Sequence, residues 1–249
     1  MKTKIYTELE STHTWLKNNV SEIEPDTLII ARAQTAGRGQ RGNSWEAEPD
    51  KNLTFSFLHY PQNLPPRLQF AISEALSLAI LNTLSRYGIL AKIKWPNDIY
   101  VGHKKICGIL IDHAISNPES IDRTIAGAGL NINQRVFRSN APNPVSMADI
   151  AGHEFSIPDI TATLCQELDN LLPLVSTPDG REALHSSFMA NLYRGDGNFH
   201  PYRIVAENRE RNARIVNVDS SGPISLKFED GTISSFAFKE IEFILPVQE

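Results

Sequence analysis

Two different spacings of apolar residues alternate along the first part of the chain. Short segments rich in β-compatible residues cover positions 5–9, 27–33 and 53–60, and they predict strands. Residues 67–87 instead carry apolar side chains at helical intervals and end before Gly88, a residue suited to a helix C-terminal cap. This segment is the longest helix that the pattern predicts.

Further strands are expected between residues 89 and 133. The segments 89–95, 99–101, 104–115 and 123–133 are separated by turn-forming residues, and together they predict strands of one sheet.

Three shorter helices are expected around this sheet. Ser11 or Thr12 can cap the first one, because either side chain can accept a hydrogen bond from a free backbone N–H. Pro158 is suited to the first position of the second helix, and apolar spacing predicts a third over residues 181–193.

The composition changes near residue 194. Residues 194–198 (RGDGN) are rich in turn formers, and 214–236 predicts three short strands with an Asp-Gly hairpin turn at 230–231. We therefore predict strands of one sheet together with helices in residues 1–193, and a small β domain in residues 194–249. A tail of about 55 residues is close to the minimum for a core of its own, so we expect it to pack on the main domain.

Composition narrows the classes of partner and compartment. The formal net charge of −5 in 249 residues argues against broad nonspecific binding to DNA or RNA. Cys107 and Cys165 have no metal-ligand spacing and are too few for a disulfide framework, so a cytoplasmic location is expected. The N-terminus has no signal-peptide pattern, and no run approaches the about 18 apolar residues needed to span a bilayer, so no membrane partner is expected.

The stretch GRGQRGNSW at 37–45 has the spacing of two nucleotide-binding motifs. Gly37, Gly39 and Gly42 fit a dinucleotide fingerprint, but that motif requires a helix directly after the glycines, and here Pro49 and a non-periodic segment follow. A phosphate-binding P-loop would need lysine where Asn43 stands. The stretch therefore satisfies neither motif.

Two readings of this loop remain open. Arg38 and Arg41 can form two-point contacts with carboxylate or phosphate, and closely spaced glycines let backbone N–H groups approach an anion. This chemistry suits a lid that closes over an anionic ligand. The alternative is a solvated surface loop with two ordinary arginines.

The order of motifs along the chain resembles the biotin protein ligase family. The motifs are ESTHTW at 10–15, Gln34, GRGQRGNSW at 37–45, KWPND at 94–98, KKICGIL at 104–110 and GAGLNIN at 127–133. The resemblance covers nearly the whole chain. It implies the α+β catalytic fold of that family, a mixed, mainly antiparallel sheet with helices that is similar to class II synthetases. A small SH3-like β-barrel would follow it.

The resemblance also implies a two-step reaction. Biotin and ATP would give biotinyl-5′-AMP and pyrophosphate, and a lysine of a biotin carboxyl carrier domain would then accept the biotin. Cations lower the barrier for a carboxylate that attacks a polyanion, and the resemblance implies that Lys105 and Arg38 supply them. It also implies that Asp98 is a catalytic residue. Asp98 is also expected to act through Mg²⁺, an ion that carboxylate and phosphate oxygens can coordinate together.

The binding residues follow from the same motifs. The resemblance implies a biotin site made of Ser11, Thr12, His13, Gln34, Arg38, Gly39, Gln40, Lys105, Gly108 and Ile109. It implies a nucleotide site made of Arg41, Trp45, Lys94, Asn97 and Asn131. Each has a simpler alternative, such as helix capping for Ser11 or a solvent-exposed lysine for Lys105, and Cys107 is expected to be a core thiol.

The chain departs from the common family pattern at three positions. Gln40 and Asn43 stand where arginines are common, and His13 stands where an asparagine is common. A lid with fewer charges is expected to hold the adenylate less firmly, because a charge-assisted hydrogen bond contributes roughly 1.5–3 kcal/mol.

Two alternative functions are compatible with the fold that the resemblance implies. One is a lipoate ligase or octanoyl transferase, and the other is a biotin-binding regulator without turnover. Because the Ser-Thr motif begins at residue 11, we expect no DNA-binding module ahead of it and no DNA partner. A homodimer occurs in relatives and is kept open here.

Overall fold

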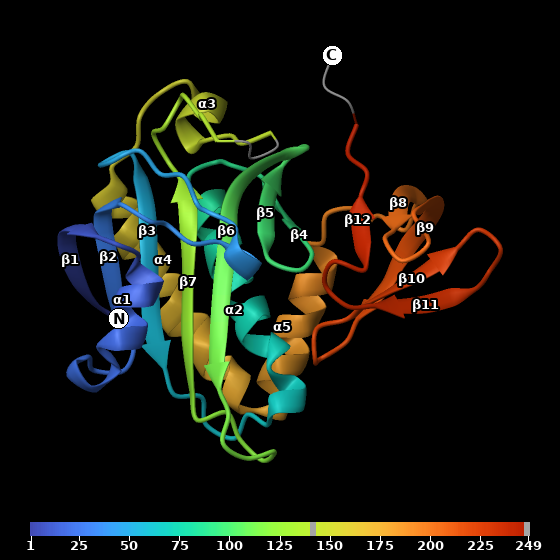
Figure 1. The fold of residues 1–249 in the computed structure, drawn as a ribbon, viewed down its shortest axis with the longest axis horizontal. Helices are drawn as coiled ribbons and strands as arrows, with labels where there is room; N and C mark the ends of the chain where they lie inside the picture. Colours follow the sequence, from blue (N-terminus) through green and yellow to red (C-terminus); the bar gives the residue numbers. More distant parts are fainter. Residues whose placement is uncertain (140–142, 247–249) are drawn as a thin grey trace.

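The computed structural model describes residues 1–139 and 143–246. Figure 1 labels the elements. The strands are β1 (Lys2–Leu9), β2 (Thr27–Gln34), β3 (Asn52–His59), β4 (Lys92–Lys94), β5 (Asp98–Val101), β6 (Lys104–Ala114), β7 (Arg123–Asn131), β8 (His200–Ile204), β9 (Arg209–Val218), β10 (Ile224–Phe228), β11 (Ile233–Phe236) and β12 (Ile241–Phe243). The helices are α1 (Thr12–Asn18), α2 (Phe70–Arg86), α3 (Met147–Ala151), α4 (Ile157–Leu171) and α5 (Pro178–Ala190), with 3₁₀ turns at η1 (Val20–Glu22), η2 (Gln40–Gly42), η3 (Pro66–Leu68) and η4 (Leu172–Ser176).

A seven-stranded sheet forms the centre of the larger domain. Its strand order is β1-β2-β3-β7-β6-β5-β4, and only the β1–β2 pair is parallel. The mixed, mainly antiparallel α+β fold that the sequence predicts is therefore confirmed.

Helices cover both faces of this sheet. Along β2, Leu28 and Ile30 point into the large core that also contains the buried residues of α2 and α4, whereas Ile29 belongs to a smaller cluster with Leu16 of α1. Alternating side chains on a strand face opposite sides, so α1 lies on the face opposite α2, α4 and α5 (Figure 1). The face that carries α1 is the one that holds the cavity described below.

The helix ends can be compared with the caps and boundaries that the sequence predicts. Ser11 caps α1, since its Oγ accepts a hydrogen bond from Thr14 N–H at 3.4 Å. The longest helix begins at Phe70 rather than residue 67, because residues 66–68 form a 3₁₀ turn after two prolines. Thr177 caps α5, which therefore spans Pro178–Ala190 instead of the expected 181–193.

Residues 66–86 also bear on the expectation about membranes. By length and composition alone this helical segment is apolar enough to cross a bilayer, with a mean hydropathy of 1.3 over its most apolar window. The sequence-based expectation overlooked it because polar residues, such as Ser73, Glu74 and Ser77, interrupt the apolar run. However, 72% of the window is buried inside the fold, which is the packing of a core helix.

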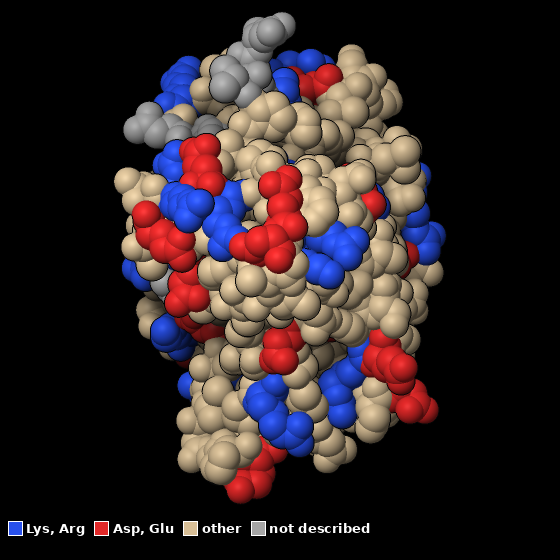
Figure 2. Space-filling view, turned by 90° about the vertical axis from the view of Figure 1, so that its right-hand side faces the viewer, with Lys and Arg blue, Asp and Glu red and all other residues tan. Residues whose placement is uncertain are grey.

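The C-terminal residues form a five-stranded antiparallel sheet. Its order is β11-β10-β9-β8-β12, so the small β domain is confirmed, and the structure adds β8 and β12 to the three expected strands. Charges of both signs are mixed over the face that this domain presents (Figure 2), with ion pairs such as Arg203–Glu210 and Arg211–Asp230.

The small domain packs directly on the larger one, as predicted. Trp95 donates a hydrogen bond from Nε1 to the carbonyl of Gly222 at 2.8 Å, and Ser220 accepts one from the Phe70 N–H at 3.2 Å. One continuous apolar core includes Tyr202 and Ile241 of the small domain together with the residues of α2. A boundary at residue 194 stays a prediction.

Candidate functional site

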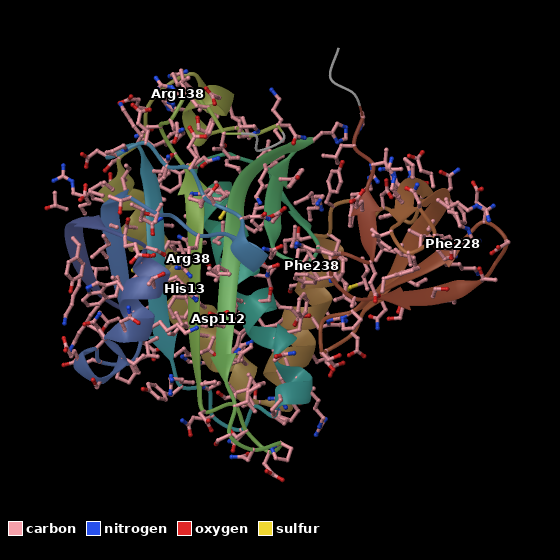
Figure 3. The ribbon with its side chains drawn as sticks, in the orientation of Figure 1. His13, Arg38, Asp112, Arg138, Phe228 and Phe238 are labelled. Carbon is pink, nitrogen blue, oxygen red and sulfur yellow. The ribbon has the colours of Figure 1, made fainter. Side chains whose placement is uncertain are left out.

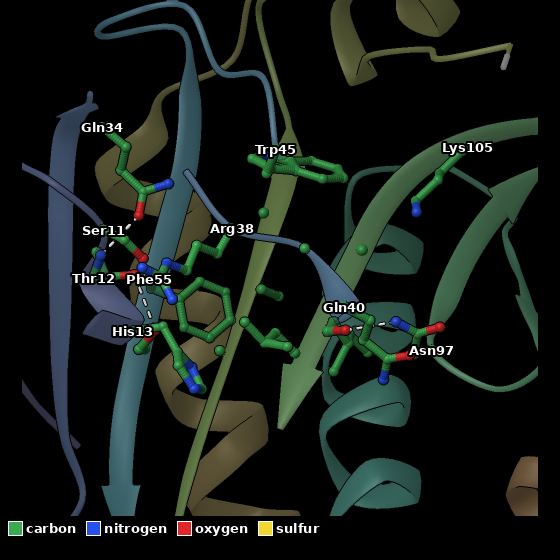
Figure 4. A pocket seen from close by; sticks show the side chains of 18 residues that line it. Ser11, Thr12, His13, Gln34, Arg38, Gln40, Trp45, Phe55, Asn97 and Lys105 are labelled. Carbon is green, nitrogen blue, oxygen red and sulfur yellow. Dashed lines mark hydrogen bonds between the residues drawn. The ribbon is translucent and has the colours of Figure 1, made fainter. Parts of the chain in front are cut away.

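A cavity opens on the α1 face of the large sheet (Figure 4). Its lining comes from the N-terminus of α1, the end of β2, the loop 37–45, and strands β3, β6 and β7. The lining residues are Ser11, Thr12, His13, Gln34, Arg38, Gly39, Gln40, Trp45, Phe55, Ser56, Asn97, Lys105, Gly108, Ile109, Leu110, Gly127, Ala128 and Gly129. All ten residues predicted for the biotin site are in this set.

One end of the cavity is a polar cluster at the start of α1. Gln34 Oε1 accepts a hydrogen bond from the Thr12 N–H at 2.8 Å, and Thr12 Oγ1 lies 2.9 Å from Ser56 Oγ. Ser11 and Thr12 are almost completely buried, at 1% and 3% exposed. Such a cluster can hydrogen-bond a ring that carries both donors and acceptors.

His13 lies beside this cluster and contacts the sheet. Its Nε2 is 3.0 Å from Asp112 Oδ2 of β6, and Figure 3 shows His13, Arg38 and Asp112 close together in front of the strands. Burial lowers the pKa of His13, and the opposing effect of Asp112 is smaller. The ring is therefore neutral at neutral pH.

The floor of the cavity consists of three glycines, Gly108, Gly127 and Gly129. The register places Gly108 directly opposite Gly129 on the β6–β7 pair. The Trp45 indole lies on this glycine floor, so close that Nε1 is 2.2 Å from the position of a Cβ on Gly129. Any side chain at Gly129 would displace the indole.

Trp45 also narrows the cavity. Its Nε1 is buried and has no hydrogen-bond partner among the described residues, and the cavity volume is only about 50 Å³. Ligand pockets usually measure roughly 300–1,000 Å³. The cavity is therefore smaller than a ligand of biotin's size needs while the Trp45 indole lies against Gly108 and Gly129.

The other end of the cavity carries an ion pair. Lys105 Nζ lies 2.5 Å from Asp98 Oδ1, and both side chains are largely shielded, at 25% and 16% exposed. The same Nζ lies 5.6 Å from the centre of the Trp45 ring. A shielded cation held by a carboxylate is suited to stabilise negative charge that develops on a substrate.

Asn97 supports this end through the backbone. Its Nδ2 donates to Ile109 O at 2.7 Å, and its own carbonyl accepts from the Ile109 N–H at 2.9 Å. The side chain of Ile109 belongs to the core on the helix side, so the cavity meets its main chain. Asn97 thus fixes the turn of the KWPND motif to β6, and its predicted contact with a nucleotide stays a prediction.

The lid, residues 37–45, folds as a small hairpin over the cavity. Gly39 N–H donates to Asn43 O at 2.7 Å, and Trp45 N–H donates to Gly37 O at 2.9 Å. Gln40 Oε1 is buried without a partner among the described residues. The side chain of Arg41 lies outside the part of the structure that is described. Its expected role in nucleotide binding concerns that side chain and stays a prediction.

Two residues predicted for the nucleotide site lie outside this cavity. Lys94 Nζ is 4.8 Å from the ring centre of Phe243 and 5.2 Å from that of Tyr100, and burial lowers its pKa. Asn131 is buried and donates from Nδ2 to Val145 O at 3.1 Å, while its Oδ1 has no partner among the described residues. Their roles toward a nucleotide stay predictions.

Several residues of the site were not predicted from the sequence. Ser56, Leu110, Gly127 and Gly129 share a face of the sheet with Gly108, which only the register reveals. Asp112 lies four residues after Gly108, so the period-2 rule for strands could have placed it on the same face.

Few of the described side chains near the cavity could bind a metal ion. The described residues contain no group of three histidine, cysteine or acidic side chains that could hold a metal ion. The Asp98 carboxylate lies next to the cavity through its ion pair with the lining residue Lys105. One carboxylate fits a Mg²⁺ ion that arrives with nucleotide phosphates and keeps its waters, not a resident metal centre. Cys107 is not a nucleophile, because burial raises the pKa of its thiol.

The fold and this cavity define a member of a known enzyme class. Residues 6–131, just over half of the chain, match the model of the biotin/lipoate A/B protein ligase family, and the chain belongs to that family. Among its relatives, the bifunctional ligase/repressor BirA of Escherichia coli (strain K12) is 25% identical over 238 residues, which cover 94% of this chain and 71% of the relative.

Other similarities are consistent with this membership. Biotin-protein ligase 2 of Arabidopsis thaliana is 33% identical over 129 residues, which cover 50% of this chain and 38% of that protein. The solved structure of biotin protein ligase from Aquifex aeolicus in complex with biotin and ATP matches with a TM-score of 0.77 and 22% identity, covering 97% of both chains. At this level of identity, the structural match shows the same fold.

Proposed function

We propose that this chain is an ATP-dependent biotin protein ligase. It activates biotin to biotinyl-5′-AMP and then transfers the biotin to a lysine of a biotin carboxyl carrier domain. The observation that carries the proposal is the single cavity in which ten residues from four sequence motifs meet. Family membership and the names of the relatives support it.

The shape of the cavity suits an elongated ligand with different ends. Asp112, which holds His13, and Gly108, beside which Lys105 Nζ lies, are four residues apart on β6. Four residues of a strand span roughly 13–14 Å. The polar cluster would take the ureido ring of biotin, and Lys105 would face the carboxylate.

The first step needs a carboxylate to approach a polyanion. A carboxylate oxygen of biotin attacks the α-phosphorus of ATP, and pyrophosphate leaves. Lys105 and Arg38 reduce the repulsion between the two anions, and Asp98 orients Lys105. Asp98 would also hold Mg²⁺ brought by ATP, which neutralises phosphate charge when bound.

The second step transfers the acyl group. The ε-amine of the acceptor lysine attacks the acyl carbon of the adenylate, AMP leaves, and the amine loses a proton. Closure of the lid over the cavity limits hydrolysis of the adenylate before the acceptor arrives. A cytoplasmic location and a homodimer stay predictions from the sequence.

The polar end of the cavity favours biotin over lipoate. Ser11, Thr12 and Gln34 provide hydrogen-bonding groups at the buried end. The dithiolane ring of lipoate has no N–H or carbonyl to satisfy them, and unsatisfied buried polar groups are costly.

One experiment tests the proposal. The protein is incubated with ATP, Mg²⁺, a biotin carrier domain and either biotin or lipoate, and the intact mass of the carrier is measured. Gain of one biotinyl group, dependent on ATP, is the expected result. No gain with biotin would overturn the proposal, and gain with lipoate alone would identify a lipoate ligase.

A further inference from the structure

The most informative unexplained atom at the site is a ring nitrogen of His13. The residue is 6% exposed, and its Nδ1 is buried with no hydrogen-bond partner among the described residues. Buried polar atoms in native proteins are normally paired, so such an atom at a cavity wall points to a ligand.

The other ring nitrogen determines what Nδ1 can do. Nε2 lies 3.0 Å from Asp112 Oδ2, and a carboxylate only accepts hydrogen bonds. Partial burial works to raise the pKa of Asp112, but its contacts with His13 and Lys17 outweigh this and hold it below the usual range. The proton of the neutral ring therefore resides on Nε2, and Nδ1 is left as an acceptor.

We propose that Asp112 is a positioning residue that holds His13 in the tautomer whose Nδ1 accepts a hydrogen bond from a ureido N–H of biotin. This inference rests on the proposed function and adds a specificity determinant to it. The ureido group offers two N–H donors, so its recognition needs acceptors. The neighbouring Gln34 Oε1 is already engaged by Thr12 N–H.

At position 13 this chain has a histidine where an asparagine is common in the family. Where an asparagine is common, its amide supplies both a donor and an acceptor without help. Here a histidine supplies the acceptor only when a carboxylate on β6 fixes its tautomer. A ligand without an N–H at this point, such as lipoate, would leave Nδ1 unpaired.

The proposal also gives biotin binding a pH dependence with a definite sign. The charged groups that act on His13 are Asp112 of β6, Lys17 of α1 and Arg38 of the lid. Protonation converts Nδ1 into a donor, which cannot accept from a ureido N–H. Because burial lowers the pKa of His13, this loss begins only below the usual histidine range.

The test is calorimetric titration of biotin into the full-length protein without ATP. Asp112→Ala removes the acceptor for Nε2 and is expected to raise the biotin Kd about tenfold. Asp112→Asn keeps an oxygen acceptor and is expected to bind within about threefold of wild type. In this variant, the loss of biotin binding at acid pH should begin at a lower pH than in wild type. The reason is that the negative charge that favours protonated His13 is gone.

A matched control is available elsewhere in the chain. His59 Nδ1 lies 2.7 Å from Asp26 Oδ1, with side-chain exposures of 11% and 49%, close to the 8% and 50% of the His13–Asp112 pair. Neither residue of this control pair lines the cavity. Asp26→Ala should leave the biotin Kd unchanged.

A double-mutant cycle separates positioning from general structure. In a His13→Asn background, Asp112→Ala should no longer affect the Kd, because Asp112 acts through the imidazole. An unchanged Kd in the single Asp112→Ala variant, an equal loss in the His13→Asn background, or a loss of binding at acid pH that begins at the wild-type pH in Asp112→Asn would each overturn the inference. Failure of the wild-type protein to bind biotin would instead refute the proposed function.

Discussion

Lys105 is the residue on which the proposed chemistry depends most. Its backbone joins β6 to residues 143–145, because its N–H donates to Asn143 O at 2.9 Å and its carbonyl accepts from Val145 N–H at 3.0 Å. Its side chain instead points to Asp98. A side-chain substitution can therefore remove the charge while the backbone contacts persist.

We expect Lys105→Ala to lower the rate of biotinyl-adenylate formation by about 100-fold or more, because a positioned group that stabilises developing charge is removed. Pyrophosphate release in single-turnover assays measures this step. Lys104→Ala is the matched control, since Lys104 is the exposed neighbour on the same strand. Equal rates in wild type and Lys105→Ala would exclude the assigned role.

At the residue scale, the sequence was most informative where a motif carries its own chemistry. His13, Gln34 and Lys105 could be predicted as members of one site because the motif order resembles a family. Gly129 could not, because its place opposite Gly108 depends on strand register. Lys94 lies in a predicted motif, yet its charge sits among aromatic rings near the small domain.

Among the elements, the lid connects the two halves of the site. Its hairpin holds Trp45 on the glycine floor, and Glu46 directly after it accepts hydrogen bonds from the Arg138 and Ser139 N–H groups. These hydrogen bonds connect the end of the lid to the segment that follows β7. A lid of this kind can retain a labile intermediate only through the contacts that it makes when closed.

Restoring arginine at Gln40 and Asn43 is expected to reduce escape of the adenylate. Each new charge-assisted hydrogen bond of about 1.5 kcal/mol would slow release about tenfold. The measurement is the rate at which free biotinyl-AMP appears when no acceptor is present. Gln40→Lys with Asn43→Lys is the control, because lysine restores charge without two-point geometry. Release rates equal to wild type in the arginine variant would show that these positions do not hold the adenylate.

Most elements could be predicted because their spacing is pronounced. The long buried helix α2 and strands β2 and β3 are examples, with boundaries correct to within a few residues. The short strands β8 and β12 were missed. β8 contains Pro201 and β12 spans only three residues, so neither has enough alternation of apolar and polar residues to predict a strand.

At the scale of the whole molecule, the two sheets share one core. His185 of α5 links them, with Nδ1 2.7 Å from Glu74 Oε1 on α2 and Nε2 3.3 Å from Asn217 Oδ1 on β9. A cavity of about 290 Å³ lies beside this link. Because the core is continuous, we expect the chain to unfold in a single cooperative transition.

The Glu74 carboxyl makes this transition depend on pH. Burial raises its pKa, and the opposing effect of His185 is smaller. Ionised Glu74 is therefore less favourable in the folded protein than in the unfolded chain. As pH rises from the usual glutamate range through the raised pKa of the folded state, Glu74 lowers the free energy of unfolding, and above that pKa the loss is complete.

Glu74→Gln removes this titration while keeping an oxygen that can accept from His185. The difference in Tm between the variant and wild type should therefore be more positive at about pH 7.5 than at about pH 5. Differential scanning calorimetry measures both values, and Glu182→Gln is the control because Glu182 is exposed on α5. A difference that does not change between the two pH values would mean that Glu74 ionises equally well in the folded and unfolded chain. Two separate transitions would mean that the shared core does not couple the domains.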